Sequence, residues 1–254
     1  MPTPTSVKFN DYQLDNIDPR IVETLFHDSA PSREISIYKI ARRDGEKLVA
    51  SYFERKTISL KGYIQKDTTA NLELAIDELK KMVHLEGNLD IEYAGGTRRY
   101  RAIMSELAIE REPDHLDWCP YSITFIVPEG KGKDIIQTIV DYGSLNSSPY
   151  SGEFNNLGSA EARPKIYIGG TGAGEIQIID SSARYLKILN KEANKFVRID
   201  YDKWSVEEAD TEEGEGTPIP YEGVFTEWLA GINFFTIVFA GTITVKFKYF
   251  KEFL

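Results

Sequence analysis

Apolar and polar residues alternate along many short stretches of this chain, which is the pattern of half-buried β-strands. The clearest stretch lies near the C-terminus, where residues 242–249 alternate without a break. Residues 56–64 do the same and place Ile58, Leu60 and Ile64 on one face of the expected strand. The pattern therefore predicts a mainly β protein.

The predicted strands fall into two groups, and the first group surrounds one helical segment. Its six stretches are 35–40, 48–53, 56–64, 89–93, 99–107 and 121–127. In residues 71–85 the apolar positions change to helical spacing, with Asp67, Thr68 and Thr69 as candidate caps and Gly87 beyond the end. This segment is predicted to be the single amphipathic helix of an N-terminal β domain.

The second group has no helical pattern. Its seven stretches are 165–168, 175–179, 185–189, 196–201, 223–228, 232–239 and 242–249. Their short, even spacing predicts a β-sandwich or jelly roll. Residues 143–163, which begin with a run rich in Ser, Asn, Gly and Pro, are predicted to be a linker. The predicted domains are therefore residues 1–142, with the helix at 71–85, and residues 164–254.

Composition excludes several classes of function. The 254 residues include 30 Lys and Arg against 40 Asp and Glu, a formal net charge of −10. This charge opposes binding to a phosphate backbone, so nucleic acid is not expected as the primary ligand. The single cysteine cannot form an internal disulfide, which fits synthesis in a reducing cytoplasm. No signal peptide or long apolar stretch is evident, and membrane insertion is not expected.

Motifs that carry chemistry are weak in this sequence. His27, His84 and His115 are too far apart for metal-ligand spacing, so no metal site is expected. The glycine-rich residues 169–174 lack the ending of a phosphate loop and are predicted to be a flexible hairpin loop. The acidic residues 207–215 lack the pattern of a calcium loop and are predicted to be solvated.

No enzyme is predicted, because no catalytic or cofactor-binding residue stands out. Cys119 begins an apolar strand and is expected to be a small buried residue, not a nucleophile. A glycosidase would need two carboxylates flanking a cleft, which an acidic composition alone does not indicate. Trp204, Tyr221 and Trp228 could form an aromatic platform for a saccharide, although aromatic residues in a sandwich are more often core.

Several segments occur in the order found in one known family. Residues 55–64, the helical segment after them and residues 98–102 (Arg-Arg-Tyr-Arg-Ala) resemble the N-terminal half of the distal tail proteins of long-tailed bacteriophages and related prophages. Residues 156–166 and 229–237 resemble the C-terminal half of the same family. The resemblance extends over most of the chain from about residue 54 onward.

This resemblance implies a structural protein of the virion, made in the host cytoplasm. A β-barrel-like N-terminal domain would build a homo-hexameric ring, single or stacked as a dodecamer, and a galectin-like β-sandwich would project from it. The ring would join the tail tube protein to the baseplate hub or tail-associated lysin, and receptor-binding proteins could attach for host attachment. DNA would only pass through the lumen of the ring. Acidic residues lining that lumen would repel the DNA and keep it from binding. This short chain has no carbohydrate-binding insertion, and a carbohydrate-binding module that recognises host-surface saccharide is the alternative function.

Overall fold

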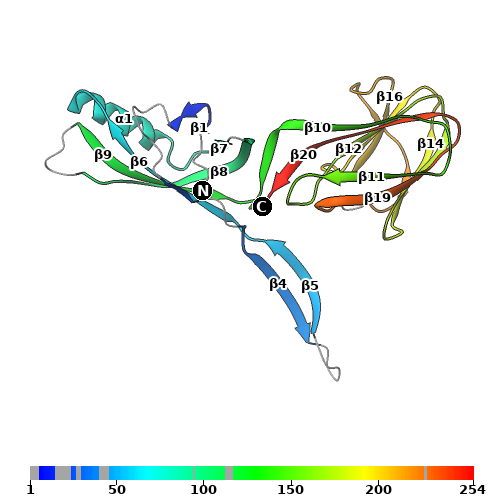
Figure 1. Cartoon of the computed structure of the whole chain (residues 1–254), viewed down its shortest axis with the longest axis horizontal. Coiled ribbons are helices and arrows are strands. Elements are labelled where there is room, and N and C mark those ends of the chain that lie inside the picture. The colour runs from blue at the N-terminus through cyan, green and yellow to red at the C-terminus, as the bar shows by residue number, and fades with distance from the viewer. Residues whose placement is uncertain are drawn as a thin grey trace. The chain divides into compact units, whose positions relative to one another are not determined.

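The computed structural model describes residues 6–14, 24–26, 30–39, 46–93, 95–111, 117–225 and 228–254. The chain divides into two compact units, residues 1–135 with Leu254 and residues 136–253. Figure 1 shows that strands dominate both units, as the alternating pattern predicted. The sequence predicted domains at residues 1–142 and 164–254. These limits differ from the division into compact units and stay a prediction.

The first unit is built from antiparallel strands and one helix. Its elements are β1 (Ser6–Phe9), β2 (Tyr12–Gln13), β3 (Thr24–Phe26), β4 (Arg33–Lys39), β5 (Glu46–Phe53), β6 (Lys56–Gln65), α1 (Thr69–Lys81), β7 (Glu86–Tyr93), β8 (Gly96–Ile109), β9 (Trp118–Val127) and the start of β10 (Gly132–Leu145). The pairing runs from β3 through β6, β9, β8, β7 and β1 to β2.

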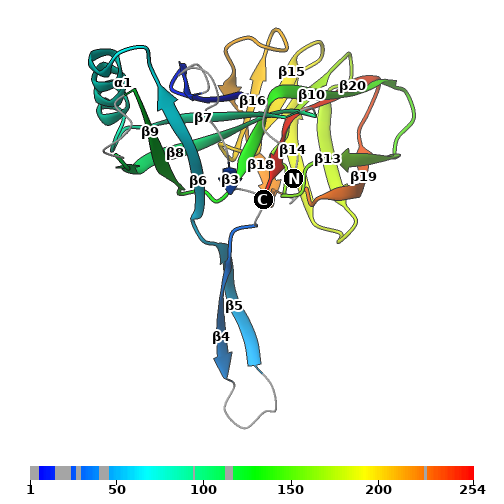
Figure 2. The same cartoon turned by 60° about the vertical axis from the view of Figure 1, so that its left-hand side comes forward.

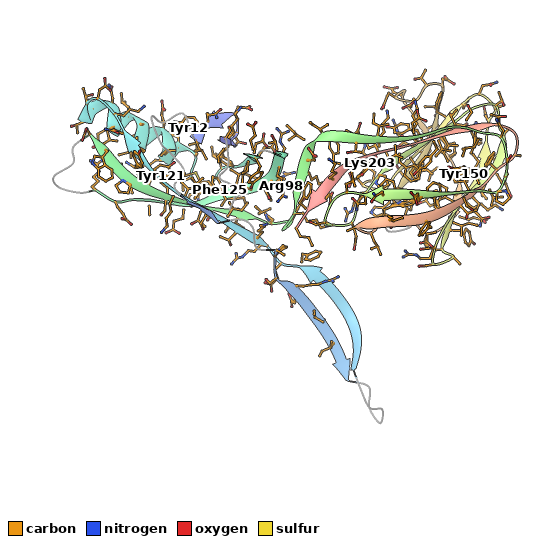
Figure 3. All side chains as sticks on the ribbon, viewed as in Figure 1. Tyr12, Arg98, Tyr121, Phe125, Tyr150 and Lys203 are labelled. Atoms are coloured by element: carbon orange, nitrogen blue, oxygen red, sulfur yellow. The ribbon has the colours of Figure 1, made fainter. Side chains whose placement is uncertain are left out.

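Strand β8 changes its pairing partner along its length. Its first part pairs with β7 and its last part with β9, and the register shifts between Met104 and Glu106. Such a shift bends a strand and increases its twist. Apolar residues of β1, β6, β7, β8, β9 and α1 share one core. Figure 3 labels Tyr121 and Phe125, two of these core residues, on β9.

The helix forms where the sequence predicted it. Thr68 caps the start, since its hydroxyl accepts a hydrogen bond from the Asn71 amide at 3.3 Å. Leu72, Ala75, Ile76 and Leu79 are buried on one face. The helix ends at Lys81, four residues before the predicted end, because Met82 is the C-cap and His84 takes a left-handed φ of 68°.

Strands β4 and β5 form a separate two-stranded sheet (Figure 2). On β4, Ile35 and Ile37 are 58% and 55% exposed. At the base of this hairpin the Glu54 amide donates to the Ser32 carbonyl at 2.8 Å, next to the buried Pro31. This hydrogen bond fixes the base of the hairpin. Among the described residues, β4, which carries the exposed isoleucines, pairs with β5 alone.

The second unit is a β-sandwich. Besides the rest of β10, its strands are β11 (Tyr150–Asn156), β12 (Lys165–Gly169), β13 (Gly174–Asp180), β14 (Tyr185–Lys191), β15 (Phe196–Asp200), β16 (Ser205–Ala209), β17 (Thr217–Pro218), β18 (Tyr221–Gly223), β19 (Gly231–Val238) and β20 (Ile243–Phe253). One layer has the order β17-β16-β15-β12-β20-β10, and the five-stranded layer has the order β11-β19-β13-β14-β18. Both contribute to one core, as predicted for a sandwich.

The predicted linker differs from the observed structure. Within residues 143–163, β10 continues to Leu145 and β11 pairs with β19 over Tyr150–Asn156. Figure 3 labels Tyr150 at the start of β11. The small and polar residues of this segment are strand residues, because a strand at the edge of a layer needs few buried side chains. Phe154 and Asn156 are the buried positions of β11.

Candidate functional site

Two of the three aromatic residues predicted to contact saccharide lie together on the surface of the second unit. Trp204 follows the turn between β15 and β16 and is 54% exposed, and Tyr221 on β18 is 40% exposed. Both rings pack edge-on against Phe225, with centroid distances of 5.2 and 5.5 Å. The Tyr221 hydroxyl donates to the Trp204 carbonyl at 3.5 Å. The structure thus forms an exposed aromatic edge, and saccharide contact there stays a prediction.

Trp228 is not part of this edge. Its side chain is 1% exposed and packs edge-on against Phe154 and Phe247, with centroid distances of 5.3 and 5.2 Å. A ring enclosed in this way cannot reach a ligand, so the prediction that Trp228 contacts saccharide is wrong. Its burial follows from the bridge between Ala162 and Trp228, which draws this segment onto the core.

The turn that presents Trp204 is fixed by Asp200. The Asp200 carboxylate accepts hydrogen bonds from the amides of Asp202 and Lys203, at 3.0 and 3.2 Å. Trp204 itself has a left-handed φ of 53°. This conformation costs a non-glycine residue about 1 kcal/mol. It is maintained because Asp200 binds the turn before Trp204 and the Tyr221 hydroxyl binds the Trp204 carbonyl.

The glycine-rich residues 169–174 do not form a phosphate loop. The buried Lys191 ammonium donates to the carbonyls of Gly170, Gly172 and Glu192, at 3.2, 2.8 and 2.8 Å. Burial lowers the pKa of Lys191. The loop therefore presents carbonyl oxygens to the Lys191 ammonium. Such a set of acceptors is unsuited to binding an anion. It also passes from β12 to β13 in the other layer, so the predicted flexible hairpin loop is wrong.

The acidic residues 207–215 are partly paired and not simply solvated. Glu207 and Glu208 lie on β16, where Glu207 pairs with Arg198. Glu212 accepts a hydrogen bond from the Lys248 ammonium at 2.8 Å, and Glu213 pairs with the same group. Hydrogen bonds from Lys248 lower the pKa of both carboxyls. Glu207 and Glu208 are therefore strand residues, and Glu212 and Glu213 pair with β20, although the Glu213 side chain stays 65% exposed.

The remaining candidates give no catalytic or metal cluster within the described residues. Cys119 is buried, and burial raises the pKa of its thiol, which disfavours the nucleophilic thiolate. His84 lies just after α1, and His27 and His115 lie outside the described residues. The described ranges contain no group of three metal-ligating side chains. No described helix is long and apolar enough to cross a membrane.

The hairpin of β4 and β5 is a site that sequence reasoning missed. Both strands were predicted in outline, but their separation from the main sheet was not. Each strand pairs with its hairpin partner alone, so each leaves one edge of backbone donors and acceptors unpaired in the described structure. The hairpin and the aromatic edge are therefore two exposed surfaces of the described structure.

Comparisons with known proteins found one matching family model and similar solved structures. Residues 7–116 match the family model of the phage tail protein RIFT-related domain. The crystal structure of the phage SPP1 Dit protein, described as a paradigm of hub adsorption apparatus in phages that infect Gram-positive bacteria, has 15% identity and a TM-score of 0.73. The alignment covers 98% of this chain and 99% of that one. Among curated proteins, none matches.

A more distant similarity concerns chains of a phage baseplate. The phage P2 baseplate in its activated conformation with Ca gives 8% identity, a TM-score of 0.39 and coverage of 97% of both chains. The resemblance to distal tail proteins is confirmed by the tail domain over residues 7–116 and by the fold of the whole chain. Residues 7–116 therefore match a phage tail domain, and the whole chain has a fold similar to that of the SPP1 Dit protein.

Proposed function

We propose that this protein forms a homo-hexameric ring at the tip of a phage tail, between the tail tube and the baseplate hub or tail-associated lysin. The tail domain over residues 7–116 and the distal tail fold support this function. In this proposal the protein resides in the virion after synthesis in the host cytoplasm, and its work is done by interfaces without catalysis. Receptor-binding proteins attach to its periphery, and DNA passes through the lumen.

The β4–β5 hairpin is the observation that carries the ring proposal. A closed ring needs a heterologous contact, in which one surface of each copy meets a different surface of the next. The hairpin supplies one such surface, because its strand edges are unpaired within the described chain and Ile35 and Ile37 are exposed. Strand pairing with the neighbouring copy would satisfy the edges, and burial of the isoleucines would stabilise the contact.

A double substitution, Ile35→Asp with Ile37→Asp, tests this role. Both side chains are exposed, so the free energy of unfolding should change little. Two charges buried in the contact should weaken ring assembly more than tenfold, since unpaired charges in an interface cost several kcal/mol. Mass photometry should therefore show rings for the wild type and monomers for the variant.

Val224→Asp is the matched control, because Val224 is similarly exposed, at 54%, but lies outside the hairpin. It should assemble like the wild type. Ring formation by the double variant at wild-type concentrations would show that the hairpin is not the ring contact.

The alternative function, a carbohydrate-binding module for host-surface saccharide, keeps one supporting observation. Trp204 is exposed and is held in an unfavourable backbone conformation by its turn, and such strain is often found at binding sites. The loss of Trp228 to the core leaves only Trp204 and Tyr221 as contacts at that edge.

A further inference from the structure

A concavity of about 380 Å³ lies over β19, on the face of the five-stranded layer that points away from the core. Phe234 and Thr236 of β19 lie at its centre. Ser151 and Glu153 of β11 lie on one side, and Ile179 and Ser181, from β13 and the turn after it, on the other. Neither Trp204 nor Tyr221 lines this concavity, which is therefore distinct from the aromatic edge.

Strand register explains why these side chains share one face. Glu153 is the partner of Phe234 across the β11–β19 pair, and Ser151 is the partner of Thr236. Gly152 faces the core between them, since a Cβ at that position would lie 2.8 Å from the Phe235 ring. Phe235 is buried, whereas the adjacent Phe234 is 60% exposed.

The wall on the β13 side is held rigidly by Asp180. Its carboxylate accepts hydrogen bonds from the amides of Ser182 and Arg184, both at 2.9 Å, and from the Arg184 guanidinium at 2.8 Å. These bonds fix the turn that carries Ser181. The Asp180 carboxylate is thus occupied by its own turn.

Glu153 on the opposite wall is different. Within the described part of the chain, no donor binds its carboxylate. The Ser151 hydroxyl lies 3.2 Å from the Thr236 hydroxyl, and either oxygen can be the donor. This pair can therefore rotate to give or accept one further hydrogen bond. The concavity offers an aromatic face, a free carboxylate and adaptable hydroxyls within the volume of a small-ligand site.

We propose that this concavity binds one hexose-sized unit of a neutral saccharide. The apolar C–H face of the sugar ring packs on Phe234, and Glu153 accepts hydrogen bonds from two sugar hydroxyls. The Ser151–Thr236 pair contacts a third hydroxyl. An anionic ligand is disfavoured, because the Glu153 carboxylate lines the site, whereas the Asp180 carboxylate is paired with Arg184. The inference is independent of the ring proposal, since it concerns the outer face of one sandwich.

Saturation-transfer NMR on the full chain tests the site. The probes are glucose, galactose, rhamnose, N-acetylglucosamine and N-acetylgalactosamine, each added singly. We expect transfer to at least one of them, and a roughly tenfold weaker affinity in Phe234→Ala and in Glu153→Gln. Phe234 and Glu153 are both exposed, so both variants should keep the wild-type circular dichroism spectrum.

Trp204→Ala is the matched control, because it also removes an exposed aromatic ring from the same unit. Unchanged binding in this variant is expected. Binding lost in Trp204→Ala but kept in Phe234→Ala would overturn the proposal in favour of the aromatic edge. Transfer to none of the five sugars would also overturn it. The native mass of the same samples reports on the ring separately.

Discussion

The buried ammonium of Lys191 occupies a position among three carbonyl oxygens, of Gly170, Gly172 and Glu192. Lys191→Met keeps an unbranched side chain one atom shorter but removes the charge and all three hydrogen bonds. Unpaired buried carbonyls are costly, so we expect the free energy of unfolding to fall by about 2–4 kcal/mol. Urea denaturation followed by tryptophan fluorescence measures this difference.

Lys195→Met is the control for that substitution. Lys195 also pairs with a neighbour, Glu192 at 2.9 Å, but both side chains are largely solvated. Its loss should change the free energy of unfolding far less than the loss of the buried Lys191 does. Equal effects of the two substitutions would show that the carbonyl contacts of Lys191 do not stabilise the loop.

The pairing of Lys248 with Glu212 and Glu213 gives the stability a dependence on pH. Hydrogen bonds from Lys248 lower the pKa of both carboxyls in the folded protein. A lowered carboxyl pKa stabilises the fold above the pKa of the unfolded chain, about 4.3 for Glu, and this contribution is lost as the pH falls. The carboxyls are partly solvated, so the total is about 1 kcal/mol.

Lys248→Met should therefore lower the free energy of unfolding at about pH 6, and the gap from wild type should shrink towards about pH 3. Lys80→Met, which removes an exposed pair with Asp77, should show almost no gap at either pH. A gap for Lys248→Met that grows on acidification would contradict the assigned pairing.

Individual aromatic residues mark the limit of what the sequence could predict at this scale. Trp204 and Trp228 both lie in short strand-rich stretches of the same unit, and nothing in the local pattern separates them. Trp228 is buried by Phe154 and Phe247, which are distant in the sequence, whereas Trp204 ends a local turn held by Asp200. The exposure of Phe234 could not be predicted either, because residues 232–239 are apolar on both faces of the expected strand.

At the scale of elements, two tyrosines protect the open edge of β11. The Tyr142 hydroxyl of β10 donates to the Glu153 carbonyl at 2.6 Å, and the Tyr249 hydroxyl of β20 donates to the Asn155 carbonyl at 3.0 Å. These bonds occupy acceptors that a foreign strand would otherwise use. Burial raises the pKa of Tyr142, so its hydroxyl remains a donor at neutral pH.

Tyr142→Phe combined with Tyr249→Phe should expose this edge. We expect a loss of about 1 kcal/mol per hydroxyl and self-association at high concentration, since an uncapped edge can pair with another copy. Sedimentation velocity detects the association, and urea denaturation measures the loss. Tyr185→Phe, on an exposed position of β14, should change neither property. Unchanged sedimentation of the double variant would argue that the hydroxyls do not protect the edge.

Elements with a strong period were predictable, and those that depend on long-range pairing were not. The helix followed from its apolar spacing and from Thr68, which caps it through Asn71. Strand β20 followed from its unbroken alternation. Strand β11 was missed because an edge strand with two buried positions has almost no apolar period. The separation of the β4–β5 hairpin was missed because its strands look like ordinary sheet members in the sequence.

For the whole molecule, short motifs in a fixed order carried more information than composition. The sequence predicted a mainly β chain with one helix and its resemblance to distal tail proteins, and the tail domain and the fold confirm both. The net charge of −10 motivated an acidic lumen, which stays a prediction because only the assembled ring defines a lumen. In the ring proposal, function depends on contacts between copies, which a single chain does not contain.

The native mass of the purified wild-type protein tests the ring proposal most directly. Mass photometry over a range of concentrations, with negative-stain images of the same samples, should give particles of six or twelve times the 28.8 kDa chain mass, with a central opening. A protein that remains monomeric at the highest concentration, and that adds no ring to isolated tail tubes, would contradict it.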